Sequence, residues 1–202
     1  MQQSKSPHLA QWTLGPILGS GGFKKVFSID NGQVKEALKI TYLNGPGQLD
    51  PLEADELANE LRARTEREVT LLSQFGGDCI VRLGGIPFHE TTWEDRPAVA
   101  YSEEHLEGMT LDKVMDQSRR RKSPPAWSEV RAVYLAGLGV IERLWEARIV
   151  HRDIKPQNVM VTGDGARPVV FFDLGIAFHV GGESLTAATL GPGTLYYRAP
   201  ET

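Results

Sequence analysis

The feature that most constrains this chain is a short polar segment between two apolar ones, residues 151–158. Its sequence is His-Arg-Asp-Ile-Lys-Pro-Gln-Asn, which sets a carboxylate, an ammonium group and a carboxamide within one loop. Strand-forming apolar residues flank it, Ile149 and Val150 before it and residues 159–161 after it. A polar loop fixed between buried segments is a common way for a rigid scaffold to present reactive groups. The segment predicts a catalytic loop, and a chance polar turn is the alternative at this point.

Composition limits the class of protein. The chain has 202 residues, of which 41% are hydrophobic and 24% charged, as in ordinary globular proteins with a core. The net charge of −4 argues against a general nucleic-acid or membrane-surface binder, and the basic run at 119–122 is expected to be a solvated loop. The single cysteine, Cys79, excludes an intrachain disulfide and predicts a reducing, cytoplasmic location. No apolar run approaches the ~18 residues of a membrane span, and residues 1–7 are polar, unlike a signal peptide.

Three glycines near the N-terminus lie between two apolar segments. Residues 12–18 predict a strand, Gly19, Gly21 and Gly22 follow, and a second apolar segment comes next. This pattern predicts a hairpin whose backbone approaches something closely, although glycine-rich hairpins are also common as plain turns.

The best-marked helix is predicted for residues 51–75. Asp50 can cap it, proline suits its first position, Glu53 lies in its first turn, and two glycines follow it. At about 100° per residue, one face collects apolar residues and has Glu68 in its middle. The apolar members are Leu57, Leu61, Leu71, Leu72 and Phe75. A carboxylate that points into a core needs a partner, and Lys39, in a strand predicted at 35–41, is the candidate.

The remaining pattern alternates strands and helices. Residues 79–86 and 97–102 predict two strands that would complete a small antiparallel sheet, and Cys79 is expected to be buried. A short helix is expected from Thr110, and a longer one over 127–148, whose regularly spaced apolar residues predict a core face. Those residues are Val130, Val133, Tyr134, Leu138, Ile141, Leu144 and Trp145. A strand pair is expected at 158–161 and 168–172.

These segments together resemble the catalytic domain of eukaryotic-type (Hanks-type) serine/threonine protein kinases. Residues 151–158 match the H-R-D-x-K-x-x-N loop, and residues 19–26 match G-x-G-x-x-G-x-V with Lys24 in place of the third glycine. Residues 37–39 match A-x-K, residues 173–175 match D-F-G with leucine for phenylalanine, and residues 199–201 match A-P-E. The resemblance runs from about Leu18 to the end of the chain.

The resemblance implies an α+β, protein-kinase-like two-lobe fold. Its N-lobe would hold an antiparallel sheet and helix C, and its helical C-lobe would be truncated. The expected divisions are a tail at 1–10, the N-lobe at 11–104, and a partial C-lobe at 105–202 with the catalytic loop and activation segment. Because the family continues with further helices, either this is part of a longer chain or a partner completes the lobe. Otherwise the apolar face of the 127–148 helix and the region around Tyr197 would be exposed.

The implied reaction transfers the γ-phosphate of ATP to a hydroxyl group of a protein substrate, with Mg²⁺ as the metal. Asp153 would orient the hydroxyl and accept its proton, and Lys155 would steady the transferred phosphate. Asn158 and Asp173 would bind Mg²⁺.

The nucleotide would be held by the N-lobe. Lys39, oriented by Glu68, would pair with the α- and β-phosphates, and Val26 would pack on the adenine. The implied contact residues are Leu18, Gly19, Ser20, Gly21, Gly22, Phe23, Val26, Ala37, Lys39, Glu104 and Leu106. Glu103 falls at the position that usually carries an apolar gatekeeper. Either the register slips by one residue there, or the back of the site is unusually polar.

Regulation is also implied. Arg152 makes this an Arg-Asp kinase, and such enzymes often use an activation-segment phosphate to satisfy that arginine. We expect Thr186 or Thr189 to carry the phosphate and to contact Arg152 and Arg64, unless both threonines are simply exposed loop residues. Thr194, in the Gly-Thr motif, is typical of serine/threonine kinases.

Three functions remain open from the sequence. The first is a serine/threonine protein kinase. The second is a pseudokinase-like module that binds ATP or acts as a scaffold, inactive because its C-lobe is incomplete. The third, a small-molecule phosphotransferase of the same fold, ranks last because such enzymes typically have glycine in place of Arg152 and lack the closing Ala-Pro-Glu motif.

Overall fold

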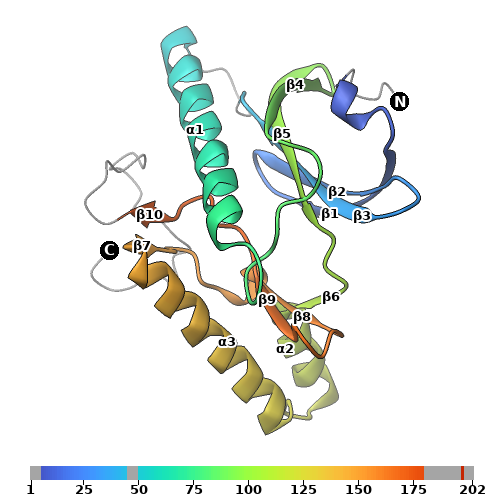
Figure 1. The fold of residues 1–202 in the computed structure, drawn as a ribbon, viewed down its shortest axis with the longest axis vertical. Helices are drawn as coiled ribbons and strands as arrows, with labels where there is room; N and C mark the ends of the chain where they lie inside the picture. Colours follow the sequence, from blue (N-terminus) through green and yellow to red (C-terminus); the bar gives the residue numbers. More distant parts are fainter. Residues whose placement is uncertain (1–5, 45–49, 180–196, 198–202) are drawn as a thin grey trace. The chain divides into compact units, whose positions relative to one another are not determined.

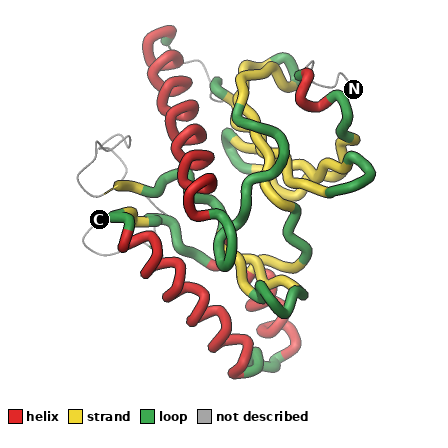
Figure 2. The backbone as a smooth tube through the Cα atoms, in the orientation of Figure 1, coloured by secondary structure: helices red, strands yellow, loops and turns green. Residues whose placement is uncertain are grey.

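The computed structural model describes residues 6–44, 50–179 and 197 (Figure 1). The chain forms two compact units. The first contains the residues up to Thr70 together with Arg82–His105, and the second contains Leu71–Val81 and the residues from Leu106 onwards. Strands dominate the first unit, whereas the second combines helices with short strands (Figure 2).

The first unit is built on a five-stranded antiparallel sheet in the order β1-β2-β3-β5-β4. The strands are β1 (Thr13–Ser20), β2 (Lys24–Asp30), β3 (Lys35–Tyr42), β4 (His89–Trp93) and β5 (Arg96–Glu104), and a 3₁₀ turn, η1 (Pro7–Leu9), precedes them. The central strand β3 is buried from Glu36 to Tyr42, so both of its faces are covered. One face is the apolar core, made by Phe27, Ile29, Leu38, Ile40, Tyr42, Ile86, Trp93, Ala98 and Ala100.

Helix α1 (Pro51–Phe75) packs on the opposite face, where Leu61 joins Leu43 and Val99 in a second cluster. Its start and end coincide with the predicted ones. The Asp50 carboxylate accepts a hydrogen bond from the Glu53 amide at 2.9 Å, which is the predicted cap. Glu68 is only 1% exposed, so the periodicity placed this carboxylate on the buried face correctly.

The strand predicted at 79–86 is wrong. The described residues there form only isolated bridges, and β4 is the strand that pairs with β5. The backbone hydrogen bonds of this segment are divided between two partners: Cys79 and Val81 bond Phe171 of β9, whereas Gly84 and Ile86 bond Ser102 of β5. The Gly85 amide between them donates to the buried Glu36 carboxylate at 2.8 Å, so no continuous ladder forms. Cys79, expected to be buried, is partly exposed in this irregular segment.

The second unit contains α2 (Leu111–Arg121), α3 (Trp127–Glu146), the 3₁₀ turn η2 (Pro156–Asn158) and two small sheets. One sheet has the order β6-β8-β9, with β6 (Gly108–Thr110), β8 (Val159–Thr162) and β9 (Val169–Phe171). The other pairs β7 (Ile149–Val150) with β10 (Phe178–His179). The catalytic-loop residues lie between β7 and β8, so short paired strands hold the loop on both sides.

Helix α3 buries only a narrow stripe. Ala136, Val140 and Leu144, spaced four residues apart, are buried. The core prediction is wrong for Val130, Tyr134, Leu138, Ile141 and Trp145, which are 39–70% exposed among the described residues. The alternative expectation of an exposed apolar face is therefore confirmed there, and Tyr197 is also exposed.

The observed sheet and helices confirm the α+β class. Across the part of the chain that the structure describes, no helix combines the length and apolar character needed to cross a bilayer.

Candidate active site

The catalytic-loop segment brings two polar side chains onto one carboxylate, that of Asp153. The Lys155 ammonium lies 2.7 Å from Asp153 Oδ2. The Asn158 side-chain amide donates to the same oxygen at 2.8 Å and to the Asp153 carbonyl oxygen at 3.0 Å. Because Asn158 is buried and Asp153 is mostly so, this carboxylate is held in one orientation by a cation and an amide.

Local sequence explains the loop conformation. Pro156 starts η2, and the backbone amide of Asn158 donates to the Lys155 carbonyl at 2.9 Å, which closes that turn. His151 is buried and its Nδ1 accepts the Asp153 amide at 3.3 Å. Arg152 has φ +66°, a left-handed conformation that costs a non-glycine residue on the order of 1 kcal/mol. Such conformations cluster at functional loops because the surroundings enforce them.

Asp173 has the same kind of backbone conformation, with φ +67°. It follows β9, and the adjacent Phe172 amide donates to the Asn158 carbonyl at 3.0 Å, so the two predicted metal ligands lie on neighbouring segments. The side-chain nitrogen of Asn158 donates to Asp153. The side-chain oxygen of Asn158 is therefore the atom that would bind a metal. No cluster of three or more histidine, cysteine or acidic residues suited to a metal occurs among the described residues. One carboxylate and one amide oxygen nevertheless fit Mg²⁺, which takes few protein ligands when phosphates supply others.

In the first unit, the Lys39 ammonium lies 2.9 Å from Glu68 Oε1. Lys39 comes from β3 and Glu68 from α1, so this ion pair joins the sheet to its helix. Their side chains are 6% and 1% exposed. Removing water from both charges makes the pair depend on close geometry, which the 2.9 Å contact supplies.

Two further charged residues join this pair, and sequence reasoning assigned neither of them to it. The Glu103 carboxylate lies 2.5 Å from the Lys39 ammonium and also accepts the Tyr101 hydroxyl at 3.0 Å. The Lys24 ammonium lies 3.3 Å from Glu68 Oε2. Burial raises the pKa of Glu103, Lys39 opposes that rise, and the charge of Glu68 adds to it. We call Lys24, Lys39, Glu68 and Glu103 the charge network.

The strand register places Glu103 on the face of the sheet that carries Lys39. Its side chain is buried and reaches Lys39, and β5 pairs with β3 so that Glu103 lies opposite Ala37. This face is therefore polar at Glu103. The assignment of Glu103 to the gatekeeper position stays a prediction. The alternation of side chains along β5 is the sequence signal that could have revealed the role of Glu103. Val99, Tyr101 and Glu103 share a face of the sheet, and of these three only Glu103 is charged.

The glycine-rich turn connects β1 and β2. A Cβ added at Gly19 or Gly22 would meet nothing within 4 Å, and neither residue needs a left-handed φ. Among the described residues the space beside these two glycines is open, and the approach of a nucleotide there stays a prediction. The Gly21 amide donates to the Lys24 carbonyl at 2.8 Å and closes the turn.

The other predicted nucleotide contacts vary in exposure. Ala37 is buried, Val26 and Phe23 are partly buried, and Leu18 and Ser20 are exposed. The Glu104 backbone amide donates to the Arg82 carbonyl at 3.0 Å, and a nucleotide contact at this residue stays a prediction. Leu106, in the second unit, is partly exposed.

The predicted regulatory residues are only partly described. Arg64 forms an ion pair with Glu60, one turn earlier on α1. Thr186, Thr189 and Thr194 lie outside the described residues, as does the motif at 199–201. The predicted contacts between a phosphothreonine and the two arginines stay a prediction.

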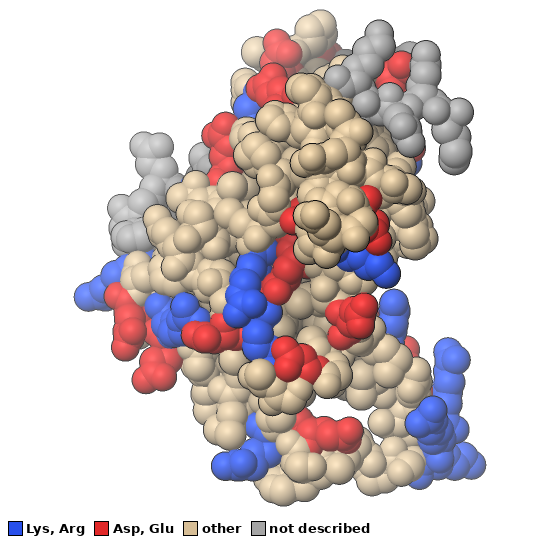
Figure 3. All heavy atoms as spheres, turned by 45° about the vertical axis from the view of Figure 1, so that its right-hand side comes forward, with Lys and Arg blue, Asp and Glu red and all other residues tan. Residues whose placement is uncertain are grey.

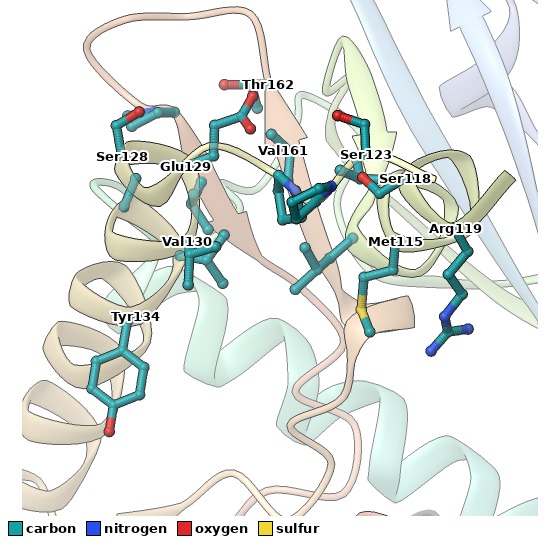
Figure 4. Close-up of a pocket in the computed structure, with 18 of the residues that line it drawn as sticks. Met115, Ser118, Arg119, Ser123, Ser128, Glu129, Val130, Tyr134, Val161 and Thr162 are labelled. Carbon is teal, nitrogen blue, oxygen red and sulfur yellow. The ribbon is translucent and has the colours of Figure 1, made fainter. Parts of the chain in front are cut away.

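A separate hollow of about 860 Å³ occurs within the second unit (Figure 4). Helices α2 and α3, the link between them and β8 form its walls, with Met115, Val130, Tyr134 and Val161 among its lining residues. No residue predicted to act in catalysis or nucleotide binding lines it.

On the face drawn in Figure 3, acidic and basic side chains are interspersed rather than gathered into one broad field.

Comparison with known proteins identifies the family. The model of the protein kinase domain family matches residues 12–202, and the chain belongs to that family. It is 28% identical over 194 residues to the probable serine/threonine-protein kinase SCO3848 of Streptomyces coelicolor, covering 95% of this chain and 26% of the relative. It is 27% identical over 187 residues to the probable serine/threonine-protein kinase PknB of Lactococcus lactis, covering 91% and 26%.

A third relative is the inactive serine/threonine-protein kinase PLK5 of Mus musculus, 31% identical over 190 residues, which cover 93% of this chain and 28% of the relative. The chain thus spans about a quarter of the length of these relatives. The prediction that the chain contains a Hanks-type kinase domain is confirmed, and with it the kinase fold.

Proposed function

We propose that this chain is the catalytic part of a serine/threonine protein kinase, which transfers the γ-phosphate of ATP to a hydroxyl group of a protein substrate. One observation carries the proposal: Asp153 is held by Lys155 at 2.7 Å and by Asn158 at 2.8 Å, as a positioned general base requires. The motifs alone supply residue types, whereas this arrangement supplies their orientation.

In the proposed reaction, Asp153 takes the proton of the substrate hydroxyl. The hydroxyl oxygen bonds to the γ-phosphorus of ATP, and ADP leaves. Lys155 holds Asp153 in place and offsets negative charge on the transferred group. Asn158 and Asp173 would hold Mg²⁺, which when bound neutralises charge on the phosphate oxygens. Phosphoryl transfer depends mainly on such positioning and charge stabilisation, and all four residues serve one of these purposes.

The assignment to serine and threonine hydroxyls, rather than tyrosine, rests on Lys155 and Thr194 and on the names of the relatives. Control by a phosphate at Thr186 or Thr189 is part of the same proposal. Phosphopeptide mapping after incubation with Mg-ATP tests it, and an active preparation with both threonines unmodified would exclude it. Cytoplasmic location stays a prediction from the sequence.

Radiolabelled ATP and a generic protein substrate test the central proposal. Asp153→Asn keeps the shape of the side chain but removes the base, and we expect a loss of about 10²–10⁴-fold in transfer. Asp116→Asn is the matched control, because Asp116 lies on α2, is 59% exposed and pairs with Arg119 on the same helix. We expect it to transfer phosphate at the wild-type rate. Equal transfer by Asp153→Asn and wild type would refute the proposal.

A module that binds ATP without transferring phosphate is the second candidate. Glu103 engages Lys39 at 2.5 Å, and one of the relatives is named as inactive. ATP binding with no Asp153-dependent transfer would favour this candidate.

A further inference from the structure

Lys24 stands where the kinase motif has its third glycine, and it reaches the charge network. The first residue of β2, it follows the glycine-rich turn directly. In the β2–β3 register Lys24 lies opposite Thr41, and Val26 lies opposite Lys39. Alternation then places Lys24 and Lys39 on the same face of the sheet, one diagonal step apart.

Lys39 already serves two carboxylates. Its ammonium lies 2.9 Å from Glu68 and 2.5 Å from Glu103, and its side chain is only 6% exposed. It also lies 5.6 Å from the centre of the Tyr101 ring. A move toward another anion would lengthen one of these contacts and leave a buried carboxylate without its cation, which is costly.

Lys24 is placed differently. Its side chain is 29% exposed, and its ammonium group lies 3.3 Å from Glu68. Its backbone carbonyl closes the glycine-rich turn through the Gly21 amide. The ammonium group is thus tethered to the turn whose glycines leave open space for a ligand.

The charge balance points the same way. With both carboxylates ionised, Lys39, Glu68 and Glu103 carry a net charge of −1, from one cation and two anions, which disfavours a nearby polyphosphate. Lys24 brings the sum over the charge network to zero.

We propose that Lys24 is the main phosphate-contacting lysine for bound ATP, while Lys39 is retained between Glu68 and Glu103 as their common counter-ion. This assignment rests on the proposed function, since it concerns how the same nucleotide is bound. It makes the exchange of glycine for lysine at 24 and the carboxylate at 103 two parts of one arrangement.

Binding of ATP and of adenosine to the whole chain separates phosphate recognition from structural support. Adenosine has the base and sugar but no phosphate. We expect Lys24→Met to weaken Mg-ATP binding by about 10- to 100-fold, the range for loss of one charged hydrogen bond, and to leave adenosine binding unchanged. Lys24→Arg should restore most of the ATP affinity.

Lys25→Met is the matched control. Lys25 is the next residue of β2, has a similarly exposed side chain at 27%, and pairs with Glu94 instead of the charge network. We expect its ATP and adenosine affinities to equal those of wild type. Glu103→Gln should release Lys39, so that adding Lys24→Met to it weakens ATP binding by less than about 3-fold.

Two results would overturn the assignment. One is Lys24→Met with wild-type ATP affinity, and the other is equal losses of ATP and adenosine affinity, which indicate structural support of Glu68. Both leave the proposed function standing, because the wild type still binds ATP. A wild-type chain that binds neither compound would overturn the nucleotide site itself, and this assignment with it.

Discussion

Substitution of Lys39 by methionine tests whether the charge network is a balanced unit. Methionine keeps most of the side-chain volume and removes the cation. Glu68 and Glu103, whose side chains are 1% and 5% exposed, then lose the cation between them, and Glu68 keeps Lys24 at 3.3 Å while Glu103 keeps the Tyr101 hydroxyl. Breaking a buried ion pair from one side costs about 3–5 kcal/mol, because a buried charge is left uncompensated.

The expected loss can be measured by urea unfolding. With an m-value of about 2–3 kcal/mol per molar urea, a loss of 3–5 kcal/mol lowers the midpoint by roughly 1–2.5 M. Far-ultraviolet circular dichroism and tryptophan fluorescence should report the same transition, since a stability change inferred from the midpoint assumes two-state unfolding.

The double variant Lys39→Met/Glu103→Met provides the control. It removes one cation and one anion and leaves Glu68 paired with Lys24, so at least about 2 kcal/mol of the loss should return. Lys25→Met, at the exposed pair with Glu94, should change stability by at most about 1 kcal/mol. A single variant as stable as wild type, or a double variant no better than the single one, would refute the charge-balance reasoning.

Three other predictions concern the scaffold. Leu144→Ala should cost about 2–5 kcal/mol because Leu144 is buried, whereas Leu138→Ala, at a half-exposed position on the same helix, should change the urea midpoint little. Gly108→Ala should destabilise the chain by about 1–3 kcal/mol, since the φ of Gly108 is +154° and a Cβ would collide with a carbonyl oxygen of β8. Gly163→Ala is the control: a Cβ there meets nothing within 4 Å, so the variant should be nearly neutral in the same assay. Burial lowers the pKa of His89, so protonation favours the unfolded chain, and the free energy of unfolding should fall as the pH drops below about 6.5. In urea titrations at successive pH values, His89→Gln should flatten this dependence of stability on pH. An unchanged dependence in the variant would contradict the assignment to His89.

Local sequence signals predicted the helix of the first unit well. Asp50, Pro51 and the two glycines after Phe75 mark its ends, and these signals act within one or two turns of chain. The same periodicity put Glu68 on the buried face. The catalytic-loop residues 151–158 were equally predictable, because their polar and apolar order is contiguous in the sequence.

Other parts depended on contacts between distant segments. Residues 79–86 have the apolar character of a strand, yet their backbone bonds are divided between β9 and β5, and the Gly85 amide donates to Glu36, more than forty positions earlier. Helix α3 shows a broad apolar pattern, but among the described residues only the stripe at Ala136, Val140 and Leu144 is buried. Periodicity shows which residues share a face and says nothing about what covers that face.

The sequence by itself determined the kinase family, the catalytic loop and the pairing partner expected for Glu68, because motifs and helical periodicity are properties of neighbouring residues. Only the tertiary structure showed that Lys24 and Glu103 belong to the same network. Their meeting depends on the register of β2, β3 and β5 and on the placement of α1, and register is fixed by packing across the sheet. A glycine replaced by lysine and an apolar residue replaced by glutamate looked like two unrelated departures in the sequence. In the folded chain their charges balance around Lys39 and Glu68.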